Sequence, residues 1–200
     1  MIIGPKYKIA RRLGAPIFEK TQTQKFALRS GKKSGSKFTR PKSDFGLQMN
    51  EKQKARMFYG VTEKQFAKYV KSALSKKGAP SVNLLNELET RLDNVVWRGG
   101  LVSTHRGARQ AVAHGHFTVN GKRVFVPSFK VKEGNIINIR EGSRNSKLFN
   151  QTDEKLGETT PPIWIKLDSK KKEIVIQNNS VESQTETLFD LSKVIEYYQR

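Results

Sequence analysis

The sequence contains no cysteine, which excludes disulfide bonds and thiolate metal sites. No run of apolar residues approaches the length that spans a bilayer. The first twelve residues, MIIGPKYKIARR, carry charges where a secretory signal needs an apolar segment. We therefore expect a soluble protein that stays in the compartment where it is made and does not enter a membrane.

Acidic residues are scarce, because the 200 residues include 18 Asp and Glu against 38 Lys and Arg, a formal net charge of +20. The surplus is concentrated in residues 1–78, which hold 20 Lys and Arg against four Asp and Glu. Such a chain repels itself unless a polyanion supplies the counter-charge, and nucleic acid is the commonest polyanion. A membrane surface is the alternative, but we find no convincing amphipathic basic helix or lipidation motif.

The most basic stretch is KFALRSGKKSGSKFTRPK, residues 25–42, which is rich in Gly, Ser and Lys and lacks apolar periodicity. Such a composition buries too little apolar surface to fold alone and is expected to become ordered against a polyanion. A flexible linker is the alternative, although a linker rarely needs so many cations. Residues 1–43 are therefore predicted to form a basic extended arm.

Apolar residues recur at helical spacing in four segments. Helices are predicted over residues 45–59, ending at Gly60, and over residues 62–78. A third helix is predicted from Ser81 to Gly99, with one apolar stripe made of Leu84, Leu85, Leu88, Leu92, Val95 and Val96. A fourth and shorter helix is predicted from Ser103 or Thr104 to Gly115.

After Gly115 the apolar period changes to two, which is typical of strands. Asn120-Gly121 predicts a tight hairpin turn, and IWIKLDSKKKEIVI, residues 163–176, predicts a second hairpin. The fold class is therefore expected to be α+β. We expect a helical domain over residues 44–88, joined by a C-terminal helix within 179–200. A module of two helices and an antiparallel sheet is expected over residues 89–178.

The fourth helix is unusually cationic for a helix that fills a core. Ser103 and Thr104 stand at its start, where backbone N–H groups and the helix dipole favour a phosphate. Arg106 and Arg109 are three residues apart and so share a face. Lys122 and Arg123 belong to the hairpin that follows, and the pattern predicts one basic surface with no catalytic groups.

The sequence resembles the RNA-binding module named after ribosomal protein S-four in three segments, RLDNVVWRGG, STHRGARQAVAHGHFTVNGKRV and VPSFKVKEGNII. The segments GPKYKIARRLG, EKQKARMFYGVTEKQF and VIEYYQR are similar to the layout of the bacterial-type small-subunit ribosomal protein S-four family. Many members of that family carry a Cys-based zinc knot near the N-terminus, which this chain cannot form. Trp97 stands where a Tyr is more usual.

The resemblance implies a structural, non-enzymatic constituent of the small ribosomal subunit in the cytoplasmic ribosome. Such proteins are primary binders of small-subunit rRNA that nucleate assembly of the subunit body by gripping a multi-helix junction in the 5′ domain. They lie where mRNA enters the subunit, which makes mRNA a further partner there. They support decoding accuracy with ribosomal protein S-five and contact neighbouring small-subunit proteins. No cofactor and no metal are expected.

The resemblance also implies which residues of the module form the RNA-contact surface. They are Arg91, Arg98, Ser103, Thr104, Arg106, Arg109, Gln110, His114, His116, Asn120 and Lys122.

Several of these residues have a simpler interpretation. Arg106 and Arg109 could form a solvated helix face, and the His residues could suggest a metal site, although no carboxylate or thiolate stands near to complete one. His105 is expected to be exposed. Trp97 and Phe117 could stack on bases, but their spacing favours core packing. An RNA-modifying enzyme is the other functional class, but the sequence shows no nucleotide-binding loop or catalytic constellation.

Overall fold

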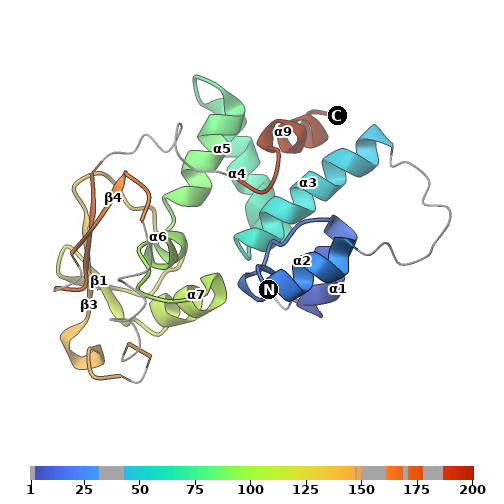
Figure 1. Ribbon diagram of the computed structural model, residues 1–200. Coiled ribbons are helices and arrows are strands. Elements are labelled where there is room, and N and C mark those ends of the chain that lie inside the picture. The colour runs from blue at the N-terminus through green and yellow to red at the C-terminus, as the bar shows by residue number, and fades with distance from the viewer. Residues whose placement is uncertain (1–2, 32–42, 147, 150–160, 169–170, 178–186) are drawn as a thin grey trace. The chain divides into compact units, whose positions relative to one another are not determined.

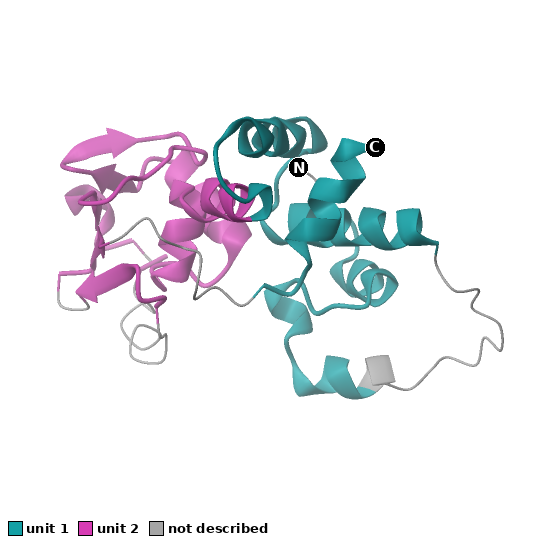
Figure 2. Ribbon diagram, turned by 90° about the horizontal axis from the view of Figure 1, so that it is seen from above, with its two compact units in different colours: residues 1–81, 186–200 teal, residues 82–185 magenta. Residues whose placement is uncertain are grey.

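The computed structural model describes residues 3–31, 43–146, 148–149, 161–168, 171–177 and 187–200 (Figure 1). The chain forms two compact units (Figure 2), residues 1–81 with 186–200 and residues 82–185. Helices dominate the first unit, and the second combines helices with a five-stranded antiparallel sheet. The α+β class predicted from the sequence is therefore confirmed. The second unit begins at residue 82, seven residues before the boundary expected from the sequence.

The N-terminal segment of the first unit is folded rather than extended. It contains α1 (Lys6–Leu13), the 3-10 helix η1 (Glu19–Thr21) and α2 (Gln24–Gly31). Its apolar side chains form a small core made of Ala10, Leu13, Ala15, Ile17, Phe18 and Phe26. The expectation of an extended arm is therefore wrong for residues 3–31, because six apolar side chains spread thinly along the sequence meet in space. The remaining Gly/Ser/Lys stretch, residues 32–42, lies outside the described residues.

The rest of the first unit consists of α3 (Asp44–Phe58), α4 (Glu63–Ser75) and the C-terminal helix α9 (Leu191–Gln199). The Ser43 hydroxyl caps α3 by accepting a hydrogen bond from the Gly46 N–H. α9 packs against α3, where the Gln48 amide donates to the Glu196 carboxylate at 2.9 Å. The end of the chain is therefore part of the helical unit.

The predicted third helix is two helices, α5 (Pro80–Glu89) and α6 (Leu92–Arg98). The break follows from competition for backbone hydrogen bonds. The Leu92 N–H donates to the Phe129 carbonyl, and the Thr90 carbonyl accepts from the Val131 N–H, both at 2.9 Å. The helical ladder is therefore interrupted at Thr90 and Arg91 by a segment about forty residues away in sequence.

α7 (His105–Ala113) leads into the sheet, which has the strand order β2-β1-β3-β5-β4 with every neighbouring pair antiparallel. The strands are β1 (Phe117–Val119), β2 (Lys122–Val124), β3 (Ile136–Ile139), β4 (Ile165–Asp168) and β5 (Glu173–Ile176). Asn120 and Gly121 have φ angles of 49° and 77°, as a type I′ turn requires. Both predicted hairpins are present.

One face of the sheet is apolar and forms the core of the second unit. Its buried side chains come from neighbouring strands in register: Phe117, Val119, Ile137, Ile139, Ile165, Ile174 and Ile176. α6 and α7 pack on each other and lie beside the strands (Figure 1). A Cβ at Gly99 would fall within the Ile174 side chain, so the end of α6 lies directly on β5. The sheet therefore positions α6, and α7 in turn packs on α6.

Candidate nucleic-acid interface

α7 presents an exposed polar stripe to solvent. Arg106, Gln110 and His114 are four residues apart and all exposed, and exposed Ser103 precedes them. Residues at this spacing share one helix face. The opposite face, made of Ala108, Ala111 and Val112, is buried. We call Ser103, Arg106, Gln110 and His114 the α7 stripe; it comprises four of the eleven residues predicted to contact RNA.

The N-terminal end of α7 suits an anion. The Thr104 hydroxyl accepts a hydrogen bond from the Gly107 N–H at 3.0 Å, so it acts as the helix cap. The first turn contains no acidic residue, and its backbone N–H groups carry the positive end of the helix dipole. Because exposed Ser103 and Arg106 flank this end, a phosphate here would meet favourable charge from both side chain and backbone.

The two arginines of α7 have different surroundings. Arg106 is exposed, whereas the Arg109 Nε atom lies 3.2 Å from Asp93 Oδ2, and Asp93 itself is buried. The sequence treats the two residues as an equivalent pair because it shows only their spacing. The structure shows one arginine available to a ligand and one in an internal ion pair.

Arg91 is not on the surface. Its side chain is 2% exposed and binds Asp93 at two points, with Nε donating to Oδ1 at 3.0 Å and Nη2 donating to Oδ2 at 2.6 Å. The sequence predicted a continuous helix through Arg91, but the helix breaks at this residue. The expectation that Arg91 contacts RNA is therefore corrected, because buried Asp93 holds the Arg91 side chain in the interior.

Arg98 also belongs to an internal network. Its guanidinium donates to both carboxylate oxygens of Glu89, at 3.1 and 2.8 Å, and that carboxylate is fully buried. Asn94 donates to the same carboxylate at 2.7 Å. The side chain of Arg98 is 18% exposed, and its guanidinium carbon lies 5.0 Å from the centre of the Trp97 ring. Most of the guanidinium therefore faces protein.

His105 is part of this network rather than simply exposed. Its ring stacks on Trp97 with the centroids 3.7 Å apart, and its Nε2 atom lies 3.0 Å from the Asn94 side-chain oxygen. The expectation of an exposed His105 is therefore wrong. Phe117 is fully buried, as core packing predicted.

The C-terminal end of α7 is surrounded by cations. Arg123 donates to the Gly115 carbonyl at 2.9 Å and to the His114 carbonyl at 3.1 Å, so it neutralises the negative end of the helix. The rings of His114 and His116 lie 6.1 Å apart and nearly parallel. The Arg140 N–H donates to the His116 carbonyl, which brings the turn after β3 to the same place.

The environment of His116 reflects this crowding. Its Nδ1 atom lies 3.0 Å from the Ser143 hydroxyl, which also accepts from the Arg140 Nε atom at 3.3 Å. Burial, followed by the positive charges of His114, Arg140 and Arg123, lowers the pKa of His116 from its ordinary 6.5. A phosphate bound here would offset those charges.

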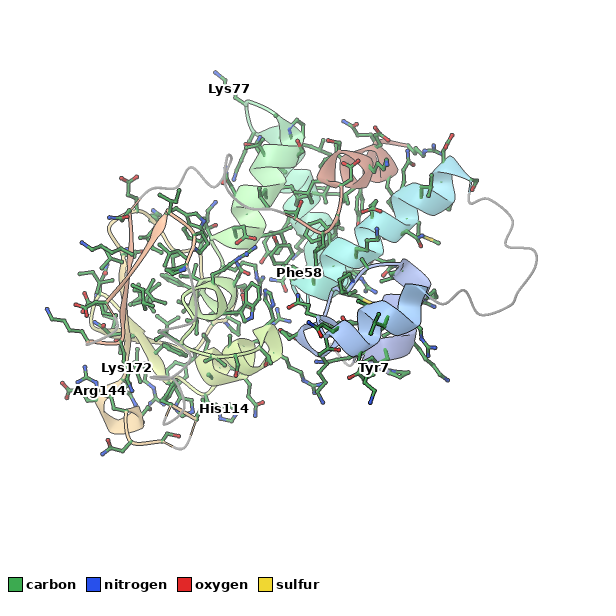
Figure 3. All side chains as sticks on the ribbon, in the orientation of Figure 1. Tyr7, Phe58, Lys77, His114, Arg144 and Lys172 are labelled. Atoms are coloured by element: carbon green, nitrogen blue, oxygen red, sulfur yellow. The ribbon has the colours of Figure 1, made fainter. Side chains whose placement is uncertain are left out.

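Sequence reasoning missed Arg140 and Arg144, which follow β3. Arg140 reaches His116 only because β3 pairs with β1, and no local pattern marks either arginine. Arg144 is exposed in the turn after β3, and His114 lies at the end of α7 (Figure 3).

The β1–β2 hairpin supplies the last two predicted residues. Both groups of Asn120 that face β3 are in use, since its side-chain oxygen accepts from the Ile136 N–H and its own N–H donates to the Ile136 carbonyl, each at 2.8 Å. Asn120 is therefore mainly a turn residue. Lys122 is exposed in β2 and can meet a phosphate.

In the described part of the chain, histidines and carboxylates form no group of three or more that could hold a metal ion. None of the helices in that part combines the length and the apolar character needed to cross a membrane.

Comparison with known proteins identifies both parts of the chain. Residues 1–89 match the family model described as ribosomal protein S4/S9 N-terminal domain, and residues 90–137 match the model of the S4 domain. The small ribosomal subunit protein uS4 of Delftia acidovorans is 38% identical over 99% of this chain and 98% of its own length. The protein of the same name from Acetivibrio thermocellus is 43% identical over 84% of each chain.

The similarity extends over 99% of the chain, and the matched S4 domain, residues 90–137, spans the positions of the α7 stripe. The family consists of structural ribosomal proteins, so the expectation that the chain is not an enzyme is confirmed. The chain belongs to the uS4 family of small ribosomal subunit proteins.

Proposed function

We propose that this chain binds small-subunit rRNA through the α7 stripe and the cations around the C-terminal end of that helix. The observation that carries the proposal is that Arg106, Gln110 and His114 form one exposed face of α7. The first turn of the same helix contains no acidic residue that would repel a phosphate. A-form RNA exposes phosphates and 2′-hydroxyls rather than the base edges of its deep groove. Guanidinium, amide and imidazole groups on a rigid helix suit that target.

The proposed contact surface is chosen by which polar side chains are exposed and which are held in internal ion pairs. It consists of Ser103, Arg106, Gln110, His114, His116, Lys122, Arg123, Arg140 and Arg144, with Thr104 and Asn120 at its margins. Arg98 and Arg109 support it from the internal networks, and Arg91 lies outside it.

Both units carry net positive charge, which suits a protein that contacts several RNA helices at once. The first unit has 22 Lys and Arg against seven Asp and Glu, and the second has 16 against 11. We therefore propose that the chain grips a multi-helix junction in the 5′ domain of the rRNA and nucleates assembly of the subunit body. This places it in the ribosome of the cytoplasm.

The resemblance to its family supports three finer parts of the proposal. The chain lies on the side where mRNA enters the subunit, it contacts ribosomal protein S-five and other small-subunit proteins, and it supports decoding accuracy.

Hydroxyl-radical footprinting of small-subunit rRNA tests the proposal. The wild-type protein should protect one set of nucleotides in the 5′ domain, clustered where several helices meet, because a rigid surface covers a fixed site. The Arg106→Ala variant should lose protection at the nucleotides nearest α7 while the other protections persist. Protection spread evenly along the rRNA would contradict a specific junction binder.

A further inference from the structure

The N-terminal part of the first unit contains a cavity that the proposed RNA surface does not use. It has a volume of about 280 Å³ and is lined, among the described residues, by Tyr7 of α1 and by Thr23, Lys25 and Phe26 at the start of α2. Ligand sites in proteins typically span roughly 300–1,000 Å³, so this cavity fits one small planar group rather than a large ligand. Tyr7 projects at the surface beside these two helices (Figure 3).

The cavity has a fixed floor and an aromatic wall. Phe26 is 9% exposed and belongs to the small core with Leu13, Ile17 and Phe18, so the floor is anchored. The Tyr7 ring stands 6.0 Å from the Phe26 ring, and half of Tyr7 is exposed. A planar group can therefore lie against Tyr7 without displacing any core side chain.

The polar groups at the cavity are hydrogen-bond donors set in a cationic surface. Lys25 has an ammonium group, and Tyr7 and Thr23 have hydroxyls. Residues 3–28 contain six Lys and Arg against one acid, Glu19. Arg11 is exposed and four residues after Tyr7, so it shares that face of α1. The ligand that fits these features is planar and flanked by negative charge.

We propose that this cavity takes one unstacked base of RNA, which stacks on Tyr7 while Lys25 and Arg11 contact the adjacent phosphates. Aromatic side chains interleaved with cations are the usual means by which proteins hold splayed bases. An acidic peptide would match the cations but has no planar ring for the exposed face of Tyr7. This proposal rests on the proposed rRNA binding and adds to it a single-nucleotide site on the helical unit.

The test measures the affinity of the full chain for small-subunit rRNA at fixed salt. Tyr7→Ala should weaken binding roughly 5- to 150-fold, the range that corresponds to removal of one aromatic stacking partner. Tyr7→Phe keeps the ring and should stay within about twofold of wild type. Leu28→Ala is the matched control, because Leu28 is an exposed apolar residue of α2 that does not line the cavity.

Salt dependence separates stacking from charge. Tyr7→Ala should lower the affinity without changing the slope of log K against log salt, because stacking releases no counterion. Lys25→Ala should reduce the steepness of that slope by about 0.7–0.9, the value for one phosphate contact. A general loss of structure would not lower the affinity in one variant and the slope in the other. The melting temperature of each variant shows independently whether it is folded.

Thr23→Met provides a second variant that fills the cavity and leaves Tyr7 in place. It should weaken rRNA binding if a base must enter. If Tyr7→Ala and Thr23→Met both bind rRNA as tightly as the wild type, the nucleotide site is overturned and the proposed function stands. The nucleotide site would also be overturned if the cavity binds an acidic peptide and neither variant changes the affinity for rRNA. Failure of the wild-type chain to bind rRNA would overturn the proposed function itself.

Discussion

Arg91 and Asp93 form a buried ion pair with two hydrogen bonds, 3.0 Å from Nε to Oδ1 and 2.6 Å from Nη2 to Oδ2. Asp93 also lies 3.2 Å from the Arg109 Nε atom, so one carboxylate joins the start of α6 to α7. The α7 helix that bears the exposed stripe is therefore tied to α6 through the buried carboxylate of Asp93. This arrangement separates positioning residues from contact residues.

The first prediction concerns that ion pair. Arg91→Ala should reduce the free energy of unfolding by up to about 3–5 kcal/mol, because it removes both hydrogen bonds that Arg91 donates to buried Asp93 and leaves only the partly exposed Arg109 as a cation for that carboxylate. Urea denaturation monitored by circular dichroism measures the effect. Arg106→Ala is the control and should change the free energy of unfolding by less than about 0.5 kcal/mol, because Arg106 is exposed. Equal effects from the two substitutions would contradict the buried assignment of Arg91.

The two arginines of α7 should respond in opposite ways. Arg106→Ala should weaken rRNA binding by roughly 1.5–3 kcal/mol at most, because one charge-assisted contact is lost, and should leave the melting temperature unchanged. Arg109→Ala should lower the melting temperature, since Asp93 loses one of its two cations. Affinity and melting temperature are measured on the same preparations. An Arg106→Ala variant that melts early and binds normally would contradict the proposed surface.

Binding should depend strongly on salt. With a net charge of +20, most of the affinity is expected to come from phosphate contacts that release counterions. The slope of log K against log salt should be negative and correspond to several phosphates, at about 0.7–0.9 for each. Titration of rRNA binding across a series of salt concentrations gives this slope. A slope near zero would rule out an electrostatic interface.

Stability should fall in mild acid because of His116. Burial and the charges of His114, Arg140 and Arg123 lower the pKa of His116 from 6.5, so the unfolded chain binds the proton at higher pH than the folded chain. The stabilisation that neutral His116 contributes to the free energy of unfolding is therefore complete above about pH 6.5. It is lost as the pH falls toward the lowered pKa. Melting temperatures between pH 8 and 5.5 should show this loss in the wild type.

The matched variant for this experiment is His116→Gln, which has no group that titrates in the range. Its melting temperature should vary less with pH than that of the wild type. Parallel curves for the two proteins would show that the acid sensitivity arises elsewhere.

Gly115 provides a test of how the end of α7 is packed. Its φ is +69°, and a Cβ there would lie 2.5 Å from the Arg123 Nε atom and 2.6 Å from the Phe125 ring. Gly115→Ala should therefore destabilise the protein by at least about 1–2 kcal/mol, the cost of a left-handed non-glycine residue, and should displace Arg123. Gly142→Ala is the control, because a Cβ there has its nearest neighbour at 3.6 Å. Thermal melting compares the two.

Features carried by local patterns were predicted correctly from the sequence. The helices α3, α4 and α7, the two hairpins and the Asn120-Gly121 turn depend on apolar spacing and on turn chemistry that neighbouring residues specify. The exposed positions of the α7 stripe follow from the same spacing, because Ala108, Ala111 and Val112 fall on the opposite, buried face of the helix. The charge distribution identified a polyanion as the partner class without any structure.

The tertiary structure decided the features that depend on residues distant in sequence. The helix break at Thr90 and Arg91 arises because residues near Phe129 and Val131 take its backbone hydrogen bonds, and this turns Arg91 inward to Asp93. The folding of residues 3–31 depends on a core that forms only in three dimensions. Spacing along the chain shows which side chains share a helix face, but only packing shows which cations remain for a ligand. Arg106 and Arg109 are alike in sequence and differ in role because just one of them lies within reach of a buried carboxylate.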